Sequence, residues 1–203
     1  MILLGAIVVA AMLLAFGLGG RLRNLADPDV RVRWWPILPL SLALQVAPIP
    51  QVGTGVGRYL PVVAVLVSYL ILGVVLVANI RLRGFVLILL GSLLNVVVIA
   101  ANQGMPVSRA AIVESENISL LEGLPTERGH AYHAATEGDV LLPLADVIPV
   151  RQPFGVVVSV GDVFTYSGTA LFLAAAMLGR PRRRSPRRDP VSREPATTSG
   201  TQP

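Results

Sequence analysis

Polar side chains recur at helical spacing in two apolar segments of this sequence. The two stripes are Ser92, Asn95 and Asn102 in the first segment, and Ser159, Asp162, Tyr166 and Thr169 in the second. Residues at such spacings share one face of a helix, and polar groups on apolar helices are costly unless they find partners. We therefore expect the two stripes to face each other. They would form a polar pocket for a small ligand or an ion, with Asp162 as its carboxylate.

Asp162 also fits a purely structural role. A carboxylate in the first turn of a helix accepts hydrogen bonds from free backbone N–H groups and lies at the favourable end of the helix dipole. In that case the helix would begin near Val163. Asn and Ser stripes can likewise act only as hydrogen-bonding contacts between helices. The sequence leaves both interpretations open for the candidate cluster, which is Asn95, Asn102, Ser159, Asp162 and Tyr166.

A second group of residues has the chemistry of a metal site. His130, His133 and Glu137 would lie on one side of a helix, and imidazole and carboxylate groups are ligands that suit zinc. The segment lacks the His-Glu-x-x-His order of zinc hydrolases, and Gly129 and Gly138 bracket it. The alternative is a pair of surface histidines. We expect no metal and no other cofactor.

The composition places these candidates in a membrane protein. Apolar residues make up 53% of the chain, charged residues only 14%, and the mean hydropathy is +0.67, whereas soluble domains carry about a quarter charged residues. The net charge of +5 does not indicate nucleic-acid binding, because the arginines border apolar runs. The sequence has no Cys, no glycine-rich phosphate loop and no Ser/His/Asp set, so a protein without enzymatic activity is the favoured interpretation over an enzyme.

The apolar runs predict an all-α integral membrane protein with five transmembrane helices, because about 20 apolar residues cross a bilayer. These helices are expected at residues 2–20, 34–50, 60–80, 85–101 and 155–178. The second run is the least apolar, since Pro36, Pro39 and Gln45 interrupt it. Arg21 and Arg23 follow the first run instead of preceding it, so we expect a retained helix rather than a cleaved signal peptide.

The only long polar interval lies between the fourth and fifth runs. Residues 102–162 hold both histidines and eight of the twelve acidic residues. We expect residues 102–153 to form a partly structured outside loop, with short helices beginning at the capping residues Ser108 and Ser119. Residues 1–178 would then be one membrane domain. Residues 179–203, rich in Arg, Pro and Ser, would be a disordered basic cytoplasmic tail.

The arginines predict the orientation. With five helices and the N-terminus outside, thirteen arginines lie on the inner side and four on the outer side, in agreement with the positive-inside rule. Leaving out the second helix would move an arginine-rich turn to the wrong side. All seventeen basic residues are Arg, which is typical of a GC-rich bacterial genome. We therefore expect the bacterial cytoplasmic (inner) membrane, with the lipid bilayer and anionic lipid headgroups at the tail as partners.

Several short motifs occur in a fixed order along the chain. They are Gly19-Gly20-Arg21-Leu22, Trp34-Trp35, Asn102-Gln103-Gly104-Met105-Pro106-Val107-Ser108, Asp146-Val147-Ile148-Pro149 and Ser159-Val160-Gly161-Asp162. Together they resemble a bacterial family of small multi-span membrane proteins catalogued as a domain of unknown function. The resemblance covers about residues 1–178, with Ala145 where we expect a glycine. It implies an integral membrane protein and no particular activity.

These observations favour a binding or scaffold component of the bacterial cell envelope. The partner would be another envelope protein or a small ligand held between the loop and the helices. A second hypothesis is a component for transport of a small solute or ion, using Asp162 and the stripe of Asn95. Against it, five helices show no inverted repeat. The third hypothesis is a membrane-bound metal hydrolase built on His130, His133 and Glu137.

Overall fold

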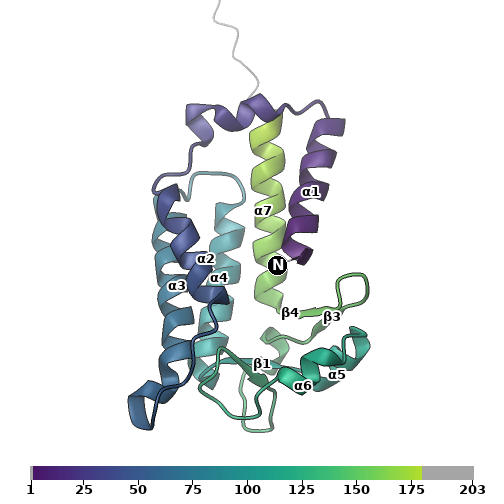
Figure 1. The fold of residues 1–203 in the computed structure, drawn as a ribbon. Helices are drawn as coiled ribbons and strands as arrows, with labels where there is room; N and C mark the ends of the chain where they lie inside the picture. Colours follow the sequence, from purple (N-terminus) through teal and green to yellow (C-terminus); the bar gives the residue numbers. More distant parts are fainter. Residues whose placement is uncertain (1, 180–203) are drawn as a thin grey trace, which may run out of the picture.

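The computed structural model describes residues 2–179 as a bundle of helices with a small folded unit at one end (Figure 1). The α-helices are α1 (Ile2–Gly17), α2 (Leu38–Val46), α3 (Leu60–Ala78), α4 (Phe85–Asn102), α5 (Arg109–Glu114), α6 (Ser119–Gly123) and α7 (Val160–Leu178). The strands are β1 (Met105–Val107), β2 (Tyr132–Ala134), β3 (Ile148–Val150) and β4 (Val156–Val158). Apart from Gly179, the predicted basic tail lies outside the described residues.

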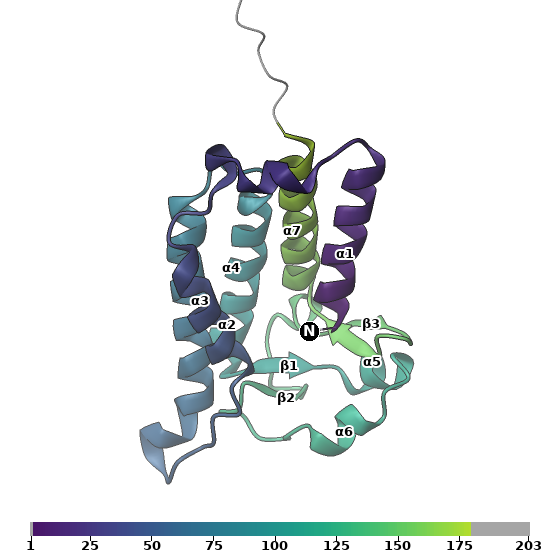
Figure 2. The same ribbon diagram turned by 45° about the horizontal axis from the view of Figure 1, so that its top comes forward.

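The bundle consists of α1, α2, α3, α4 and α7. Helix α7 packs against both α4 and α1, while α3 packs against α2 and α4 (Figures 1 and 2). Successive bundle helices run in opposite directions. The turns at residues 18–37 and 79–84 therefore lie at one end of the bundle, and residues 103–159 lie at the other (Figure 1).

Three segments of the described chain are long and apolar enough to cross a membrane. They are Gly55–Ala78, in which a 3-10 turn leads into α3, Phe85–Asn102 and Val160–Leu178. The five predicted transmembrane helices are thus not confirmed as five. Helix α1 has 16 residues and α2 has 9, and at about 1.5 Å per residue α2 extends only about 14 Å.

Glycine and proline explain why the first two helices are shorter than predicted. Helix α1 ends at Gly17, and Gly19 follows in the left-handed region with φ 88°. Pro36 lies in a 3-10 turn, Trp35–Ile37, so the α-helix begins only at Leu38. It ends at Val46 because the next residue precedes Pro48 and is extended, as residues before proline prefer.

Helices α4 and α7 approach each other closely at two pairs of glycines. A Cβ atom on Gly161 would lie 2.6 Å from the backbone oxygen of Gly91, and one on Gly168 would lie 2.6 Å from that of Gly84. No side chain fits such gaps, so glycine is required on this face of both helices. Small residues allow apolar helices to pack by backbone contact. This contact brings the polar stripes of α4 and α7 together.

Residues 103–159 fold into a compact unit of short elements. Strand β1 pairs in parallel with β2, and β3 pairs antiparallel with β4. The prediction of an all-α protein is therefore corrected: β-branched runs such as Val156–Val158 favour strands. Ser108 caps α5 through its side chain, as predicted. Ser119 does not cap α6, because it is the first helical residue and donates its hydroxyl to Asn117.

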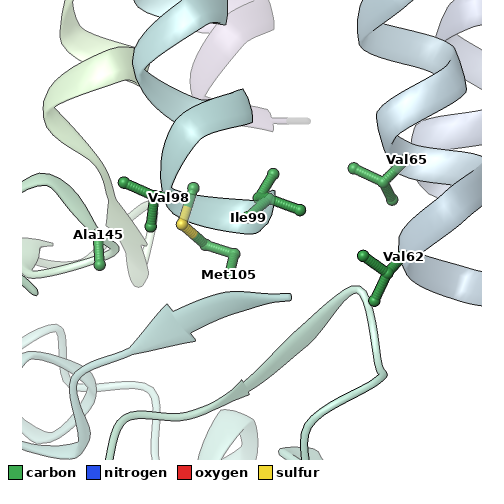
Figure 3. Packing of buried hydrophobic residues seen from close by; sticks show 6 residues of the cluster. All are labelled: Val62, Val65, Val98, Ile99, Met105 and Ala145. Carbon is green, nitrogen blue, oxygen red and sulfur yellow. The ribbon is translucent and has the colours of Figure 1, made fainter. Parts of the chain in front are cut away.

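An apolar core joins this unit to the bundle. Figure 3 shows its buried members, which are Val62, Val65, Val98, Ile99, Met105 and Ala145. Met105 of β1 lies beside Val98 and Ile99 at the end of α4 (Figure 3). Ala145 is extended with φ −74°, so this position needs no glycine. The core fixes residues 103–159 against the helices instead of leaving them as a free loop.

Candidate functional site

A cavity of about 430 Å³ lies between the helical bundle and the unit formed by residues 103–159. Its walls come from the start of α1, the end of α2 and the facing halves of α3, α4 and α7. The folded unit closes it with side chains of β1, α5, α6, β2 and β4. Small-molecule sites commonly have volumes of about 300–1,000 Å³ and combine apolar walls with a few polar groups. This cavity has both properties.

Asn95 of α4 is the centre of the polar side of the cavity. Its Nδ2 donates to Oδ1 of Asp162 at 2.9 Å and to the hydroxyl oxygen of Tyr69 at 3.3 Å. Its Oδ1 accepts from the hydroxyl of Ser159 at 2.8 Å. One buried amide thereby connects α3, α4 and α7. Because all its hydrogen bonds are to side chains, the network fixes the polar groups relative to one another.

Ser159 and Asp162 form a capping box at the start of α7. The hydroxyl of Ser159 accepts from the backbone N–H of Asp162 at 2.9 Å, and Oδ2 of Asp162 accepts from the backbone N–H of Ser159 at 3.1 Å. The N-cap is therefore Ser159, and α7 begins at Val160 rather than at residue 155 or Val163. Asp162 occupies the third helical position. It supports the cap with one oxygen and reaches Asn95 with the other.

The structure brings together part of the predicted cluster. Asn95, Asp162 and Tyr166 line the cavity, and Ser159 is fully buried behind Asn95. Asn102 lies apart from them. Its side chain donates to the carbonyl oxygen of Val140 at 2.9 Å and accepts from the N–H of Val140 at 2.8 Å. Asn102 thus attaches the folded unit to the end of α4 and does not face the cavity.

Asp146 is a cavity residue that the stripe pattern does not reveal. It follows the apolar run at 140–145, and a parallel bridge to Val107 holds its backbone. Its side chain is buried, with the residue 6% exposed, and its Oδ1 has no hydrogen-bond partner. Burial raises the pKa of Asp146 well above its ordinary value, and the negative charge of Asp162 adds to this. The Asp146-Val147-Ile148-Pro149 motif was the one sequence signal at this position.

Three tyrosines also belong to the polar lining, together with Gln45, Ser92 and Thr165. Tyr69 comes from α3, Tyr132 from β2 and Tyr166 from α7. Tyr132 lines the cavity but is itself 51% exposed, so only part of its side chain is shielded from water. Only Tyr166 belonged to a predicted stripe. Tyr69 and Tyr132 are isolated in the sequence, and only the tertiary fold brings them to the cavity.

The histidine segment does not have the predicted geometry. His133 lies in strand β2, so His130, His133 and Glu137 do not share a helix face. No group of three potential metal ligands occurs within residues 2–179. His133 is completely buried rather than on the surface, and its Nε2 lies 3.2 Å from Oδ1 of Asp139. The metal-hydrolase hypothesis therefore has no support in the described residues.

Asp139 joins the histidine to a cation. Its Oδ1 is 2.8 Å from a guanidinium nitrogen of Arg128, and its Oδ2 accepts from the N–H and the hydroxyl of Thr136. Burial alone would raise the pKa of Asp139, but the hydrogen bonds from Thr136 and the contact with His133 outweigh it, and the pKa is lowered. This cluster stabilises the turn after β2. It lies outside the cavity lining.

Residues 29–174 match a family described as a family of unknown function (DUF5317). The chain belongs to this family. The match confirms the family resemblance over residues 29–174, a shorter range than the predicted 1–178, and includes α2, α3, α4, the folded unit and most of α7. No match was found among curated proteins or solved structures. In this member of DUF5317, the cavity itself is the evidence for a functional site.

Proposed function

We propose that this protein is a membrane-embedded binding protein that holds a small ligand in the cavity between its helices and the unit formed by residues 103–159. The observation that carries the proposal is the presence, in one cavity, of two buried polar atoms that have no hydrogen-bond partner. Oγ of Ser92 and Oδ1 of Asp146 are both buried and unpaired, and both residues line the cavity. Buried polar groups are almost always hydrogen-bonded in folded proteins, so two such atoms at one cavity favour binding of a ligand that pairs with them.

The surface of the bundle supports membrane residence. Large apolar side chains are exposed along the outer faces of its helices, and examples are Leu13, Leu70, Leu90, Leu93 and Leu171. Soluble monomers rarely expose apolar surface over such an area. In this proposal the membrane is the bacterial cytoplasmic membrane, and residues 103–159 face outward. The arginine distribution along the sequence supports that orientation.

Native mass spectrometry of the full chain, purified in a neutral detergent, tests the proposal. We expect a small molecule to co-purify with the wild-type protein. Ser92→Leu places a larger side chain in the cavity and should remove that molecule. The matched control is Leu93→Phe on the same helix, which enlarges a side chain that is 53% exposed and outside the cavity lining. Equal retention of the molecule by both variants would contradict the proposal.

A further inference from the structure

The polar lining of the cavity has only one sign of charge. Asp146 and Asp162 both line it, and none of the described lining residues is Arg, Lys or His. Tyr69, Tyr132 and Tyr166 are the other titratable groups in the lining. An anionic ligand would meet two carboxyl groups there and no compensating cation. The charge pattern therefore disfavours carboxylates, phosphates and sulfates as ligands.

Asp146 and Asp162 differ in the hydrogen bonds that their carboxylate oxygens accept. The carboxylate of Asp162 accepts from Asn95 and from the backbone N–H of Ser159, so the capping box holds it in place. Oδ1 of Asp146 accepts no hydrogen bond, although the residue is 6% exposed. The hydroxyl of Ser92 also has no partner. A ligand carrying positive charge or N–H donors would satisfy these oxygens.

The tyrosines add a second feature that favours a cation. The faces of aromatic rings carry negative charge density and attract ammonium groups, and this attraction is strongest where water is excluded. Tyr69, Tyr132 and Tyr166 come from three different elements and line the same cavity as the carboxyl groups. Aromatic rings beside carboxylates are the arrangement that recognises quaternary ammonium and amine ligands.

Apart from Gln45 and Tyr69, the wall formed by α1, α2 and α3 is apolar. Leu3 and Leu4 of α1, Leu42 and Val46 of α2, and Leu72 of α3 line it. A hydrated metal ion would gain nothing from such a wall, since hard cations require a shell of oxygen ligands. No group of three potential metal ligands occurs among the described residues. A ligand that fills the cavity therefore needs an apolar part as well as a charged part.

We propose that the cavity binds an amphipathic organic cation, whose amine or quaternary ammonium group lies between Asp146, Asp162 and the tyrosine rings, and whose apolar group lies against α1, α2 and α3. This inference rests on the proposed function, namely that the cavity holds a ligand. It adds the chemical class of that ligand.

Binding of such a cation depends on pH through Asp146. The titratable groups that share the cavity with Asp146 are Asp162 and Tyr166 of α7, Tyr132 of β2 and Tyr69 of α3, and of these Asp162 raises its pKa further. Because burial raises the pKa of Asp146, its carboxyl is protonated in the empty cavity over a wider pH range than an exposed carboxyl. A bound cation favours the ionised form and expels that proton. The affinity should therefore increase with pH, by up to about tenfold per pH unit while the empty site is protonated.

Three probes with the same six-carbon chain separate the contribution of ligand charge to binding from that of the apolar chain. We would measure the binding of hexyltrimethylammonium, hexanol and hexyl sulfate to the full chain in lipid nanodiscs by titration calorimetry. The cation should bind to the wild-type protein at least about tenfold more tightly than the alcohol, because only the cation pairs with the carboxylates. The sulfate should not bind. Ser92→Leu should weaken binding of the cation, which locates it in the cavity.

Charge-removing variants then test the assignment. Asp146→Asn should lower the affinity for the cation by about tenfold or more and abolish the pH dependence of binding. Tyr132→Leu should lower the affinity without changing the pH dependence of binding. Glu122→Gln in the exposed helix α6 is the matched control, which removes one carboxylate outside the cavity lining and should have no effect.

The possible failures are distinguishable. If hexanol binds as tightly as the cation and Ser92→Leu weakens both, the cavity holds a ligand but the inference about its charge is wrong. If the cation fails to bind, or binds equally to Asp146→Asn and the wild-type protein, the inference is also overturned. The proposed function itself fails only if the co-purified molecule is absent or is unaffected by Ser92→Leu.

Discussion

Asp162 performs two roles that a sequence-based interpretation treats as alternatives. One oxygen belongs to the capping box with Ser159, and the other accepts from Asn95 at the cavity. A helix cap and a pocket carboxylate are therefore compatible in one side chain. The two roles can be separated by substitutions that remove one or both of the carboxylate oxygens.

Substitutions of Asp162 should reduce stability in a graded order. Asp162→Asn keeps one oxygen acceptor and should cost about 1 kcal/mol, because the amide cannot accept from both Asn95 and the N–H of Ser159. Asp162→Ala removes both acceptors and should cost about 2–3 kcal/mol. Thermal melts in neutral detergent without ligand would measure both. Equal stability of the Ala variant and the wild-type protein would contradict the double role.

Asp146 should behave in the opposite way, as a residue that costs stability. A carboxyl group whose pKa is raised by folding favours the folded state below its ordinary pKa, and this contribution is lost as the pH rises through the folded-state pKa. At pH 8, Asp146→Asn should therefore melt at the same temperature as the wild-type protein or higher, by about 2–4 °C per kcal/mol gained. At pH 4 the difference should vanish. A lower melting temperature at pH 8 would show that the carboxylate stabilises the fold.

The sequence could identify the residues of the site only where helical periodicity applies. Asn95, Asp162 and Tyr166 were found because each lies on a stripe of a long helix, where spacing determines the face. Asp146 and Tyr132 lie in short segments without a repeat, and long-range pairing with β1 determines their positions. His133 was misjudged for the same reason. Its spacing to His130 indicated a helix, whereas strand pairing places it in the interior.

At the scale of elements, the contact of α4 with α7 depends on the absence of side chains. Gly161→Ala should destabilise the fold by about 1–3 kcal/mol, because its Cβ would collide with the backbone of Gly91 and with the Asn95 side chain. The control is Gly73→Ala in α3, where nothing lies within 4 Å of the new Cβ. It should be neutral or stabilising, since alanine favours helices. Urea or thermal unfolding in detergent measures both, and equal effects would exclude the close contact.

The helices themselves were predictable to different degrees. The apolar runs predicted the ends of α3, α4 and α7 to within about five residues, since a long run of hydrophobic side chains indicates a helix that crosses the membrane. The second run gave a helix of only nine residues because Pro36 and Pro48 limit it at both ends. The strands were not predicted. Strands of three residues carry too little periodicity to distinguish them from loops.

At the scale of the whole molecule, the arginine-rich turns lie at one end of the bundle and the folded unit at the other (Figure 1). The positive-inside rule then predicts which end faces the cytoplasm. Reporter fusions at Glu122 and at Arg193, which lies outside the described residues, should report an outside and an inside location respectively. A cytoplasmic reporter active at Glu122 would reverse the proposed orientation.

The neighbours of α1 have a consequence for biosynthesis. Helix α1 packs against α7, and the side chain of Asn24 donates to the carbonyl oxygen of Met177, 153 residues further along the chain. At a translation rate of roughly 5–20 residues per second, α7 leaves the ribosome about 8–30 s after α1. The first helix must remain without its main partner for that interval. Leu3 and Leu4 of α1 form one wall of the cavity. Because α1 is held in place by α7, this wall is positioned only after the last helix has been synthesised. A nascent chain that lacks α7 therefore cannot hold a ligand in the cavity.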